Sequence, residues 1–485
     1  MKRAVSPAFM RAWEQRAFAR GVSALDLMEN AACALRDALK EKFGSLDQRR
    51  ILFVCGGGNN GGDGLACARL CKQGGADTAV WLLKDPQTDE AKTNADRLGN
   101  IPVLRGALPD ITGYDAVVDA LFGTGLSRPL EGAALKAVRA INAQDVFVLS
   151  VDIPSGMDGF QGTGECVRAD QTLCLACLKT GVLLADQEKT GAVRVCEIGL
   201  TDQDLPEAKE GSFLWAEEGD LPALLPHRKQ NAHKGDCGHV LLYAGSRGMA
   251  GAAAMAAKAC LRGGAGRVTI ACDEDIEPIL QTLVPNAMCS RIGRAGEIAW
   301  SVLAAGCGLG QSLEKWEHLC ALLERGLPAV LDADALTMLA EHPLRLSPRT
   351  VLTPHVGEAA RLLHVSNQEV LNDQVAAARR IHQKYGGAVL LKSAVSVLYD
   401  GRDTALNIVG TPALAKGGSG DALTGILAAV LSQQKQTDMM AAMQASALWL
   451  GLAGRAAEQE QGVYSVLTGD VIDAMGPAYL RAARP

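Results

Sequence analysis

The segment from Gly410 to Leu427 combines several glycines, one carboxylate and an apolar helical pattern. Gly417, Gly418 and Gly420 precede Asp421 directly. Glycines allow backbone N–H groups to crowd around an anion, and the start of a helix adds the positive end of its dipole. A carboxylate repels phosphate, so Asp421 fits a site that also takes a proton from the hydroxyl group attacking a phosphoryl group. We predict Asp421 to be this base; an ordinary helix cap is the alternative.

Three polar loops follow apolar runs in the first half of the chain. They are GGGNNGGDG (56–64), DALFGTGLSRP (119–129) and DIPSGMDG (152–159). In open α/β sheets, ligands bind at the carboxyl ends of the strands. Asn60, Asp119 and Ser155 would supply hard oxygen ligands, which suit an alkali or alkaline-earth cation. Ordinary turns are the alternative, but three such loops at strand ends favour a ligand site.

The elements that must position these loops alternate between strands and helices. In the first half, a helix is expected from about Gly64 to Gly74, and the strand-like runs are 51–57, 79–84, 114–123 and 146–156. Continuous apolar strands separated by helices indicate a doubly wound parallel sheet.

The stretch 201–226 is acidic, contains proline and is poorly periodic, so we place a domain boundary there. A second α/β series follows, with apolar runs at 239–246, 266–272, 301–310, 329–336, 350–358 and 388–400. No repeat links the two halves. The sequence therefore predicts two different α/β domains in one chain.

Composition limits the class of function. The chain has 485 residues, is 48% hydrophobic and only 4% aromatic, and carries a formal net charge of −6. Scarce aromatics and an acidic balance argue against a nucleic-acid partner. No apolar run is long enough to span a membrane, and the start MKRAVSPAFMRAWEQRAF resembles an amphipathic helix rather than a signal peptide. We expect a soluble, cytoplasmic protein whose fourteen cysteines are reduced.

The motifs GNNGGDG, DALFGTGLSRP and DIPSG, in this order, resemble the N-terminal domain of bifunctional NAD(P)H-hydrate repair enzymes. The second half resembles their C-terminal dehydratase domain, which has a ribokinase-like fold. The resemblance implies an epimerase domain over 1–212 and a dehydratase domain over 225–485. The first would interconvert the R and S hydrates of NADH and NADPH. The second would dehydrate the S form at the expense of ADP, giving AMP and phosphate.

The resemblance assigns residues of the first domain. Asp152 would contact the reacting part of the substrate and shuttle its proton. Asn60, Asp119 and Ser155 would bind K⁺. Lys179 in LKTG could face the same pocket, although a solvated surface lysine was an equal alternative. The remaining contacts to the hydrate would come from Asn59, Asn60, Gly61, Gly62, Asp63, Gly123, Thr124, Gly125, Leu126, Ser127, Arg128 and Pro129.

In the second domain, the resemblance assigns two groups of residues. Contacts to the hydrate would come from Ala253, Gly310, His355 and Asp421. Contacts to the nucleotide would come from Lys392, Ser393, Ala394, Val395, Ser396 and Gly420. A magnesium ion would bridge the phosphates. The chain departs from the family pattern at Gly57, Cys307 and Val356, each where proline is usual, and at Ser393, where glycine is usual.

Two other classes of function fit parts of the pattern. The second half could be a small-molecule kinase of the ribokinase-like type, joined to a non-catalytic binding module. Domains similar to the first half also occur in RNA-decapping scaffolds, but the acidic charge disfavours an RNA partner. The expected partners are NADHX, NADPHX and ADP, with no nucleic acid and no membrane, and we expect a homo-oligomer.

Overall fold

The computed structural model describes residues 1–126, 128–207, 209–434 and 438–484. The chain divides into two compact units: Arg3–Phe213, and Leu214–Pro485 together with Met1 and Lys2. Each unit is an α/β structure built on a largely parallel sheet, so the expected fold class is confirmed. Within the described ranges, no helix has the length and apolar character needed to cross a lipid bilayer.

The first unit contains a seven-stranded, all-parallel sheet in the order β4-β3-β2-β5-β6-β7-β9. The strands are β2 (Arg50–Cys55), β3 (Asp77–Leu82), β4 (Val103–Leu104), β5 (Ala116–Ala120), β6 (Phe147–Val151), β7 (Gln171–Leu175) and β9 (Ala192–Cys196). Outside this sheet, β1 (Lys2–Val5) pairs in parallel with β8 (Leu178–Lys179). The helices are α1 (Pro7–Ala19), α2 (Ala24–Phe43), α3 (Asn59–Gln73), α4 (Asp89–Asp96), α5 (Gly132–Asn142), α6 (Thr180–Leu184) and α7 (Gln187–Thr190), with a short 3₁₀ helix at Asp202–Asp204.

Alternating residues of β2 bury opposite faces of this sheet. Ile51 and Phe53 belong to a core formed with α2 and α3, whereas Leu52 and Val54 belong to a core formed with α5. Helices therefore cover both faces, as a doubly wound sheet requires. The chain leaves β2 toward β3 on one side, while β5 pairs on the other side. Ligands bind outside the carboxyl ends of strands at such a switch point.

The second unit contains strands in the order β13-β12-β11-β14-β15-β16-β17-β18-β19-β10. They are β10 (Ser212–Trp215), β11 (His239–Tyr243), β12 (Arg267–Cys272), β13 (Met288–Arg291), β14 (Val302–Ala305), β15 (Ala329–Leu331), β16 (Leu346–Leu352), β17 (Gly386–Leu391), β18 (Ser396–Tyr399) and β19 (Thr404–Asn407). The pairs from β13 to β17 are parallel, and β18 is antiparallel to both of its neighbours.

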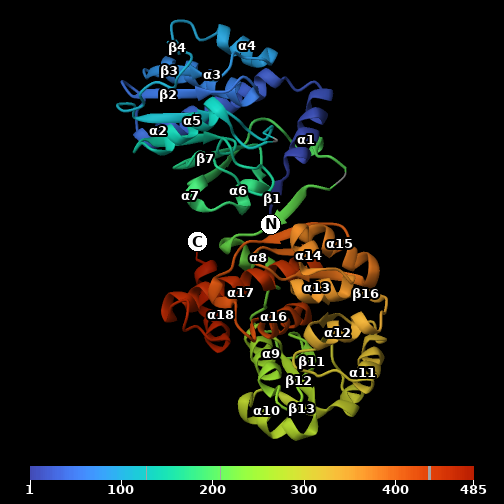
Figure 1. Cartoon of the computed structure of the whole chain (residues 1–485). Helices are drawn as coiled ribbons and strands as arrows, with labels where there is room; N and C mark the ends of the chain where they lie inside the picture. The colour runs from blue at the N-terminus through green and yellow to red at the C-terminus, as the bar shows by residue number, and fades with distance from the viewer. Residues whose placement is uncertain (127, 208, 435–437, 485) are drawn as a thin grey trace. The chain divides into compact units, whose positions relative to one another are not determined.

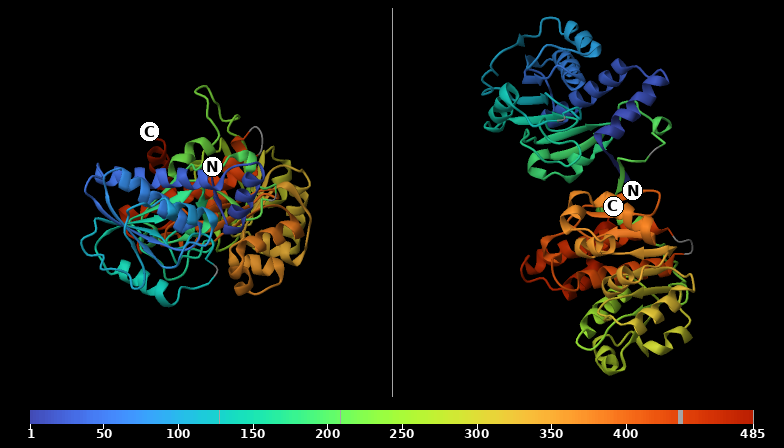
Figure 2. Two further views of the ribbon diagram at one scale, coloured as in Figure 1. Left: turned by 90° about the horizontal axis from the view of Figure 1, so that it is seen from above. Right: turned by 45° about the vertical axis from the view of Figure 1, so that its right-hand side comes forward.

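Helices also flank both sides of the second sheet (Figure 1). α9 (Ala250–Arg262), α16 (Ser419–Gln433), α17 (Met439–Gln461) and α18 (Thr468–Ala482) share one large core with the strands. In Figure 2, α17 and α18, coloured red, lie on one side of the strands, and the yellow and orange helices of residues 313–385 lie on the other. The other helices are α8 (Leu221–Leu224), α10 (Glu277–Leu283), α11 (Leu313–Leu323), α12 (Ala333–Glu341), α13 (Val356–Leu363), α14 (Asn367–Asn372) and α15 (Gln374–Tyr385), with 3₁₀ turns at Glu218–Asp220, Glu274–Ile276, Ile292–Glu297 and Pro412–Leu414.

Two local expectations were wrong. The N-terminal segment is not one helix, because Lys2–Val5 pairs as a strand before α1 begins at Pro7. The helix expected from about Gly64 begins at Asn59, so the first polar motif is a helical turn rather than a loop. The glycines there reflect close packing: a Cβ at Gly61 would lie 1.9 Å from the carbonyl oxygen of Gly56. The structure also places β7 and β9 where the sequence reading assigned no strands.

The fourteen cysteines are all free thiols in the structure, as expected. Cys174 and Cys177, which form the C-x-x-C pair, are both buried. This supports their interpretation as small apolar side chains.

Candidate active sites

The first candidate site lies at the carboxyl ends of β2, β5 and β6 in the Arg3–Phe213 unit. Asn59–Asp63 form the first turn of α3, directly after β2. Gly123, Thr124, Gly125, Leu126, Arg128 and Pro129 follow β5 in a partly exposed loop, and Ser127 lies outside the described residues. The Oδ1 atom of Asn60 lies 3.0 Å from the position that a Cβ at Gly123 would take. Two of the predicted segments are therefore neighbours.

Asp119 is the fully buried carboxylate of this site. Its Oδ2 atom accepts hydrogen bonds from Ser150 Oγ at 2.8 Å and from the Ser155 backbone N–H at 2.9 Å. Ser155 Oγ in turn lies 2.9 Å from the N–H of Phe122. Burial raises the pKa of Asp119, while its hydrogen bonds to Ser155 and Ser150 oppose the rise.

The predicted K⁺ ligands therefore gather around one buried carboxylate. Asp119 and Ser155 are in direct hydrogen-bond contact, and Asn60 approaches the loop that begins beyond Phe122. The Nδ2 atom of Asn60 is buried without a hydrogen-bond partner among the described residues. Exchange of the amide oxygen and nitrogen by rotation would present a second neutral oxygen here. Hard oxygen donors around a buried negative charge fit an alkali cation.

Asp152 and Lys179 form a buried ion pair in the same unit. The Lys179 ammonium contacts Asp152 Oδ1, and the two side chains are 1% and 10% exposed. The structure buries Lys179, so the alternative of a solvated surface lysine is wrong. Asp152 has a φ of 67°, which is disfavoured for a residue with a Cβ and occurs mostly where function or packing holds the backbone.

Two acidic groups share this region. Asp63 is 8% exposed, and its pKa lies well above the usual range because of burial, with Asp152 and Glu14 adding to the rise. Glu14, on α1, also has a raised pKa because of burial, although Lys179 opposes the shift. Glu14 was not predicted from the sequence, because no local motif links it to Asp63, Asp152 or Lys179.

The second candidate site surrounds the start of α16 in the second unit. Gly418 is the N-cap of this helix, with a φ of 97°, and Asp421 stands in the first turn. The pKa of Asp421 is about 6: burial raises it, the Cys307 thiol opposes the rise through a hydrogen bond, and Asp332 adds to it. A carboxyl group with this pKa is mostly ionised at neutral pH and remains a useful base.

Lys392 joins the end of β17 to this helix start. Its Nζ atom lies 2.6 Å from Asp332 Oδ1 and 3.9 Å from Glu358 Oε2. A Cβ at Gly420 would lie 3.2 Å from Lys392 Nζ and 3.4 Å from Asp332 Oδ2. Thr424 Oγ1 donates to the other oxygen of Asp332 at 2.9 Å. The structure thus brings Lys392, Gly420 and Asp421 together, as the sequence predicted.

Asp332 and Glu358 were not assigned by the sequence reading. Asp332 directly follows β15 and is the N-cap of α12, and Glu358 stands in the first turn of α13. Burial raises the pKa of Glu358, and Asp332 adds to the rise while Lys392 opposes it. Both residues lie in segments that were read as strand ends, DADAL and TPHVGE. Its place directly after a strand could have identified Asp332.

The other predicted residues of this site have distinct settings. His355 caps α13: its Nδ1 atom accepts the Gly357 N–H at 3.0 Å. The Gly310 N–H donates to Asp334 Oδ2 at 2.8 Å. Ala253 is fully buried in α9, where it packs beside Gly245. Ser393, Ala394 and Val395 form the turn between β17 and β18, and Ser396 begins β18.

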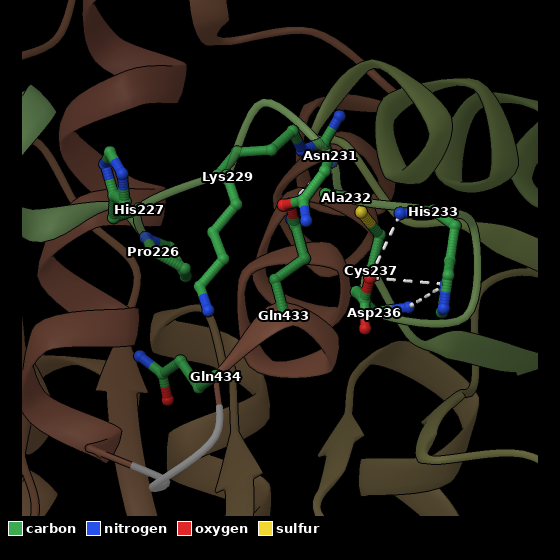
Figure 3. Close-up of a pocket in the computed structure, with 11 residues that line it drawn as sticks. Pro226, His227, Lys229, Asn231, Ala232, His233, Asp236, Cys237, Gln433 and Gln434 are labelled. Atoms are coloured by element: carbon green, nitrogen blue, oxygen red, sulfur yellow. Dashed lines mark hydrogen bonds and ion pairs between the residues drawn. The ribbon is translucent and has the colours of Figure 1, made fainter.

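A cavity of about 610 Å³ lies elsewhere in the second unit (Figure 3). It is lined by residues of 226–237 together with Gln433 and Gln434, and it contains none of the predicted site residues. Its polar groups pair with one another: Arg228 donates to Gln433 Oε1 at 2.7 Å, and the His233 N–H donates to Asp236 Oδ2 at 3.0 Å. We assign no chemistry to it.

Two protein-family models match the chain. One, described as NAD(P)H-hydrate dehydratase, matches residues 240–476. The other, described as YjeF-related protein N-terminus, matches residues 24–181. The two matches fall on the two halves for which the motifs indicated different domains.

Similar proteins of known name cover nearly the whole chain. The chain is 35% identical over 479 residues to the bifunctional NAD(P)H-hydrate repair enzyme Nnr of Coxiella burnetii, covering 95% of this chain and 96% of that one. It is also 35% identical to the enzyme of the same name from Thermofilum pendens, covering 96% of this chain and 93% of that one. The resemblance inferred from the motifs is confirmed.

Solved structures match the second unit. The ADP/ATP-dependent NAD(P)H-hydrate dehydratase of Bacillus subtilis, co-crystallised with ATP and Mg²⁺, is 30% identical with a TM-score of 0.51, over 56% of this chain and 99% of that one. A ribokinase-like superfamily protein of Enterococcus faecalis is 25% identical with a TM-score of 0.52, over 56% of this chain and 97% of that one. The expected ribokinase-like fold is confirmed.

Proposed function

The chain belongs to the family of bifunctional NAD(P)H-hydrate repair enzymes, and we propose that it carries out both reactions of metabolite repair. One domain epimerises the R and S hydrates of NADH and NADPH. The other dehydrates the S hydrate back to NAD(P)H at the expense of ADP. The observation that carries this proposal is the presence of one acid–base centre in each unit: the buried pair Asp152 and Lys179 in the first, and the partly buried Asp421 and Lys392 in the second. We assign the two activities to residues 1–212 and 225–485.

The dehydration begins with Asp421 as base. The C6 hydroxyl of the hydrate gives its proton to Asp421 while its oxygen bonds to the terminal phosphoryl group of ADP, and AMP leaves. Backbone N–H groups at 417–420 stabilise the charge on the transferred phosphoryl group. The phosphate then leaves C6 as the lone pair on the ring nitrogen moves in, and loss of a proton from the adjacent ring carbon restores NAD(P)H.

Lys392 would bind the phosphate groups of the nucleotide. Its ammonium is held by Asp332 and lies within reach of a group placed over Gly420. Burial lowers the pKa of Lys392, but Asp332 and Glu358 more than offset this and the pKa lies above its usual value. Lys392 therefore stays charged and can neutralise a phosphate oxygen.

Asp332 and Glu358 would hold the Mg²⁺ ion. Three carboxylates, those of Asp332, Glu358 and Asp421, interact with the single ammonium group of Lys392 here. Oxygen donors with excess negative charge suit Mg²⁺. When bound, the ion would neutralise charge on the phosphates.

Asn60, Asp119 and Ser155 would hold K⁺ in the epimerase domain, as argued from the buried Asp119 carboxylate. Its charge would compensate Asp119 and fix the loop that follows β5. The substrates would lie against Asn59–Asp63 and the loop at 123–129. We further propose that the enzyme works in the cytoplasm and as a homo-oligomer.

The alternative, a small-molecule kinase with a non-catalytic N-terminal module, has less support. Relatives named as bifunctional repair enzymes align with both halves of the chain. The first unit also contains Asp63, Asp152 and Lys179 buried together, a costly arrangement for a passive module.

Two variants test whether epimerisation and dehydration occur at separate sites. Asp421→Asn should lose nucleotide-dependent dehydration of the S hydrate by about 100-fold or more while leaving epimerisation intact. Asp152→Asn should lose epimerisation and leave dehydration intact. Both activities are measured on the whole chain with separated R and S hydrates of NADPH. Loss of both activities in either variant, with the fold preserved, would contradict two independent sites.

A further inference from the structure

Asp152 presents its two oxygens in different ways. Oδ1 contacts the Lys179 ammonium and accepts the Leu175 N–H at 3.0 Å. Lys179 Nζ also donates to the Leu175 carbonyl oxygen at 2.6 Å, which fixes the ammonium. Oδ2 accepts no hydrogen bond from residues that the structure describes. One oxygen is therefore anchored, and the other is free to take a proton from a ligand.

Asp63 lies near Asp152 and Lys179 but forms no ion pair with any basic side chain that the structure describes. It is 8% exposed and stands in the first turn of α3. In the part of the chain that the structure describes, its carboxyl group makes no hydrogen bond or ion pair. It nevertheless interacts electrostatically with Asp152, Glu14 and Lys179, and burial together with the two carboxylates raises its pKa well above the usual range. A largely buried carboxyl group beside two other carboxyl groups is favoured in its protonated form.

We propose that Asp63 and Asp152 are an acid–base pair that reacts directly with the hydrate, and that Lys179 is the positioning residue that makes Asp152 the base. The proposal rests on the epimerase function of this domain. It assigns opposite roles to two carboxyl groups whose surroundings differ: one is paired with an ammonium, and the other is unpaired. Such divergent environments commonly separate the acid from the base in enzymes.

The chemistry is a reversible ring opening. Asp152 Oδ2 takes the proton of the C6 hydroxyl, and the C6–O bond becomes a carbonyl. The bond between C6 and the ring nitrogen breaks, its electron pair goes to nitrogen, and Asp63 gives that nitrogen its proton. Rotation about the C5–C6 bond exposes the other face of the aldehyde. Closure by the reverse transfers returns both protons and yields the opposite epimer, with no net oxidation or reduction.

The cysteine thiols near Asp63 and Asp152 do not act as the acid or the base. Cys174, Cys177 and Cys196 lie near Lys179 and Asp152, but burial raises the pKa of each thiol, so all three stay neutral. Cys55, which feels Asp119 and Asp63, is likewise buried with a raised pKa.

The roles predict a bell-shaped pH dependence of kcat/KM for epimerisation. The acid limb reports ionisation of the base, and the alkaline limb reports loss of the proton from the acid. Glu14 and Lys179 also face these two groups, so the assignment of each limb needs variants. Asp63→Asn should lower kcat/KM by about 100-fold or more and remove the alkaline limb. Lys179→Met should move the acid limb to higher pH, because the Asp152 carboxylate loses its cation, and Lys179→Arg should restore it toward the wild-type position.

Matched controls remove the same groups from exposed helix surfaces: Asp96→Asn on α4 and Lys136→Met on α5. Dehydration of the S hydrate by the same chain reports enzyme concentration, and circular dichroism reports folding. Epimerisation by Asp63→Asn within about threefold of the wild type, or with the alkaline limb unchanged, would overturn the acid role. An acid limb unmoved in folded Lys179→Met would overturn the positioning role.

If a variant fails to fold, a measurement on the wild-type protein tests the proposal instead. A carbon-13 NMR titration of its aspartate carboxyl groups should show Asp63 protonated at neutral pH, and an ionised Asp63 would overturn the pair. Failure of the proposed function looks different, because the wild-type chain would then show no epimerisation at any pH.

Discussion

Replacing Cys307 by alanine tests whether the second site holds a base tuned by its neighbours. The pKa of Asp421 is about 6, raised by burial and lowered by the hydrogen bond from the Cys307 thiol. Because the base must be ionised, kcat/KM for dehydration should fall through the acid range with a midpoint near that value. The rate constant should be about tenfold lower at pH 5 than at pH 7.

The shift expected from the substitution follows from the hydrogen bond that is lost. A hydrogen bond contributes about 0.5–1.5 kcal/mol, and one pKa unit corresponds to about 1.4 kcal/mol. The thiol donates to the charged form of Asp421, so its removal disfavours that form and raises the pKa. Cys307→Ala should therefore move the acid limb upward by about 0.4 to 1 pH unit.

The assay follows recovery of the reduced-nicotinamide absorbance from the S hydrate of NADPH with Mg²⁺ and saturating ADP, at a series of pH values. Cys320→Ala in α11 is the matched control, since Cys320 is partly exposed and lies outside the site. An acid limb that stays in place in folded Cys307→Ala, or that moves to lower pH, would refute the tuning. An acid limb of the same shape in the residual activity of Asp421→Asn would refute Asp421 as its origin.

Three further outcomes are expected. Gly425→Ala, where α16 packs on α9, places a Cβ 2.1 Å from the Ala256 carbonyl oxygen and should lower the free energy of unfolding in urea by about 1–3 kcal/mol. Gly469→Ala, with open space around its Cβ, should not lower it. Equal stability of the two variants would contradict the packing of α16 on α9. Replacing K⁺ by Li⁺ should slow epimerisation and leave dehydration unchanged, and Asp119→Asn should abolish this ion dependence; an ion dependence confined to dehydration would move the cation to the other domain. Lys392→Met should raise KM for ADP by about tenfold or more in steady-state assays, through loss of a phosphate contact, and an unchanged KM would place the phosphates elsewhere.

The helix start and Lys392 of the second site could be predicted because each belongs to a continuous local motif. Gly417–Asp421 adopt a helix start with their N–H groups at its open end, as glycine-rich composition implies. Lys392 follows directly after a continuous apolar strand, β17, and so lies at the sheet edge where ligands bind. The apolar run expected at 388–400 is nevertheless a hairpin of two strands, because β17 and β18 pair antiparallel.

The first site was harder to predict because its charges come from distant segments. Burial of Lys179 depends on β8 pairing with β1, two short strands that no periodic pattern marks. Glu14 reaches the region only because α1 packs back on the same unit. The early start of α3 was missed because glycine lowers helix propensity, whereas contact with Gly56 makes glycine necessary at position 61.

The most direct test of the account uses a mixture of R and S hydrates of NADPH. The wild-type chain is incubated in potassium buffer with Mg²⁺ and either ADP, ATP or no nucleotide, and recovery of the reduced-nicotinamide absorbance is followed to completion. Two working sites predict full recovery with a nucleotide and none above background without one, and the faster nucleotide identifies the phosphoryl donor. Recovery of the S portion alone would contradict an active epimerase domain, and no recovery with either nucleotide would contradict the repair function itself.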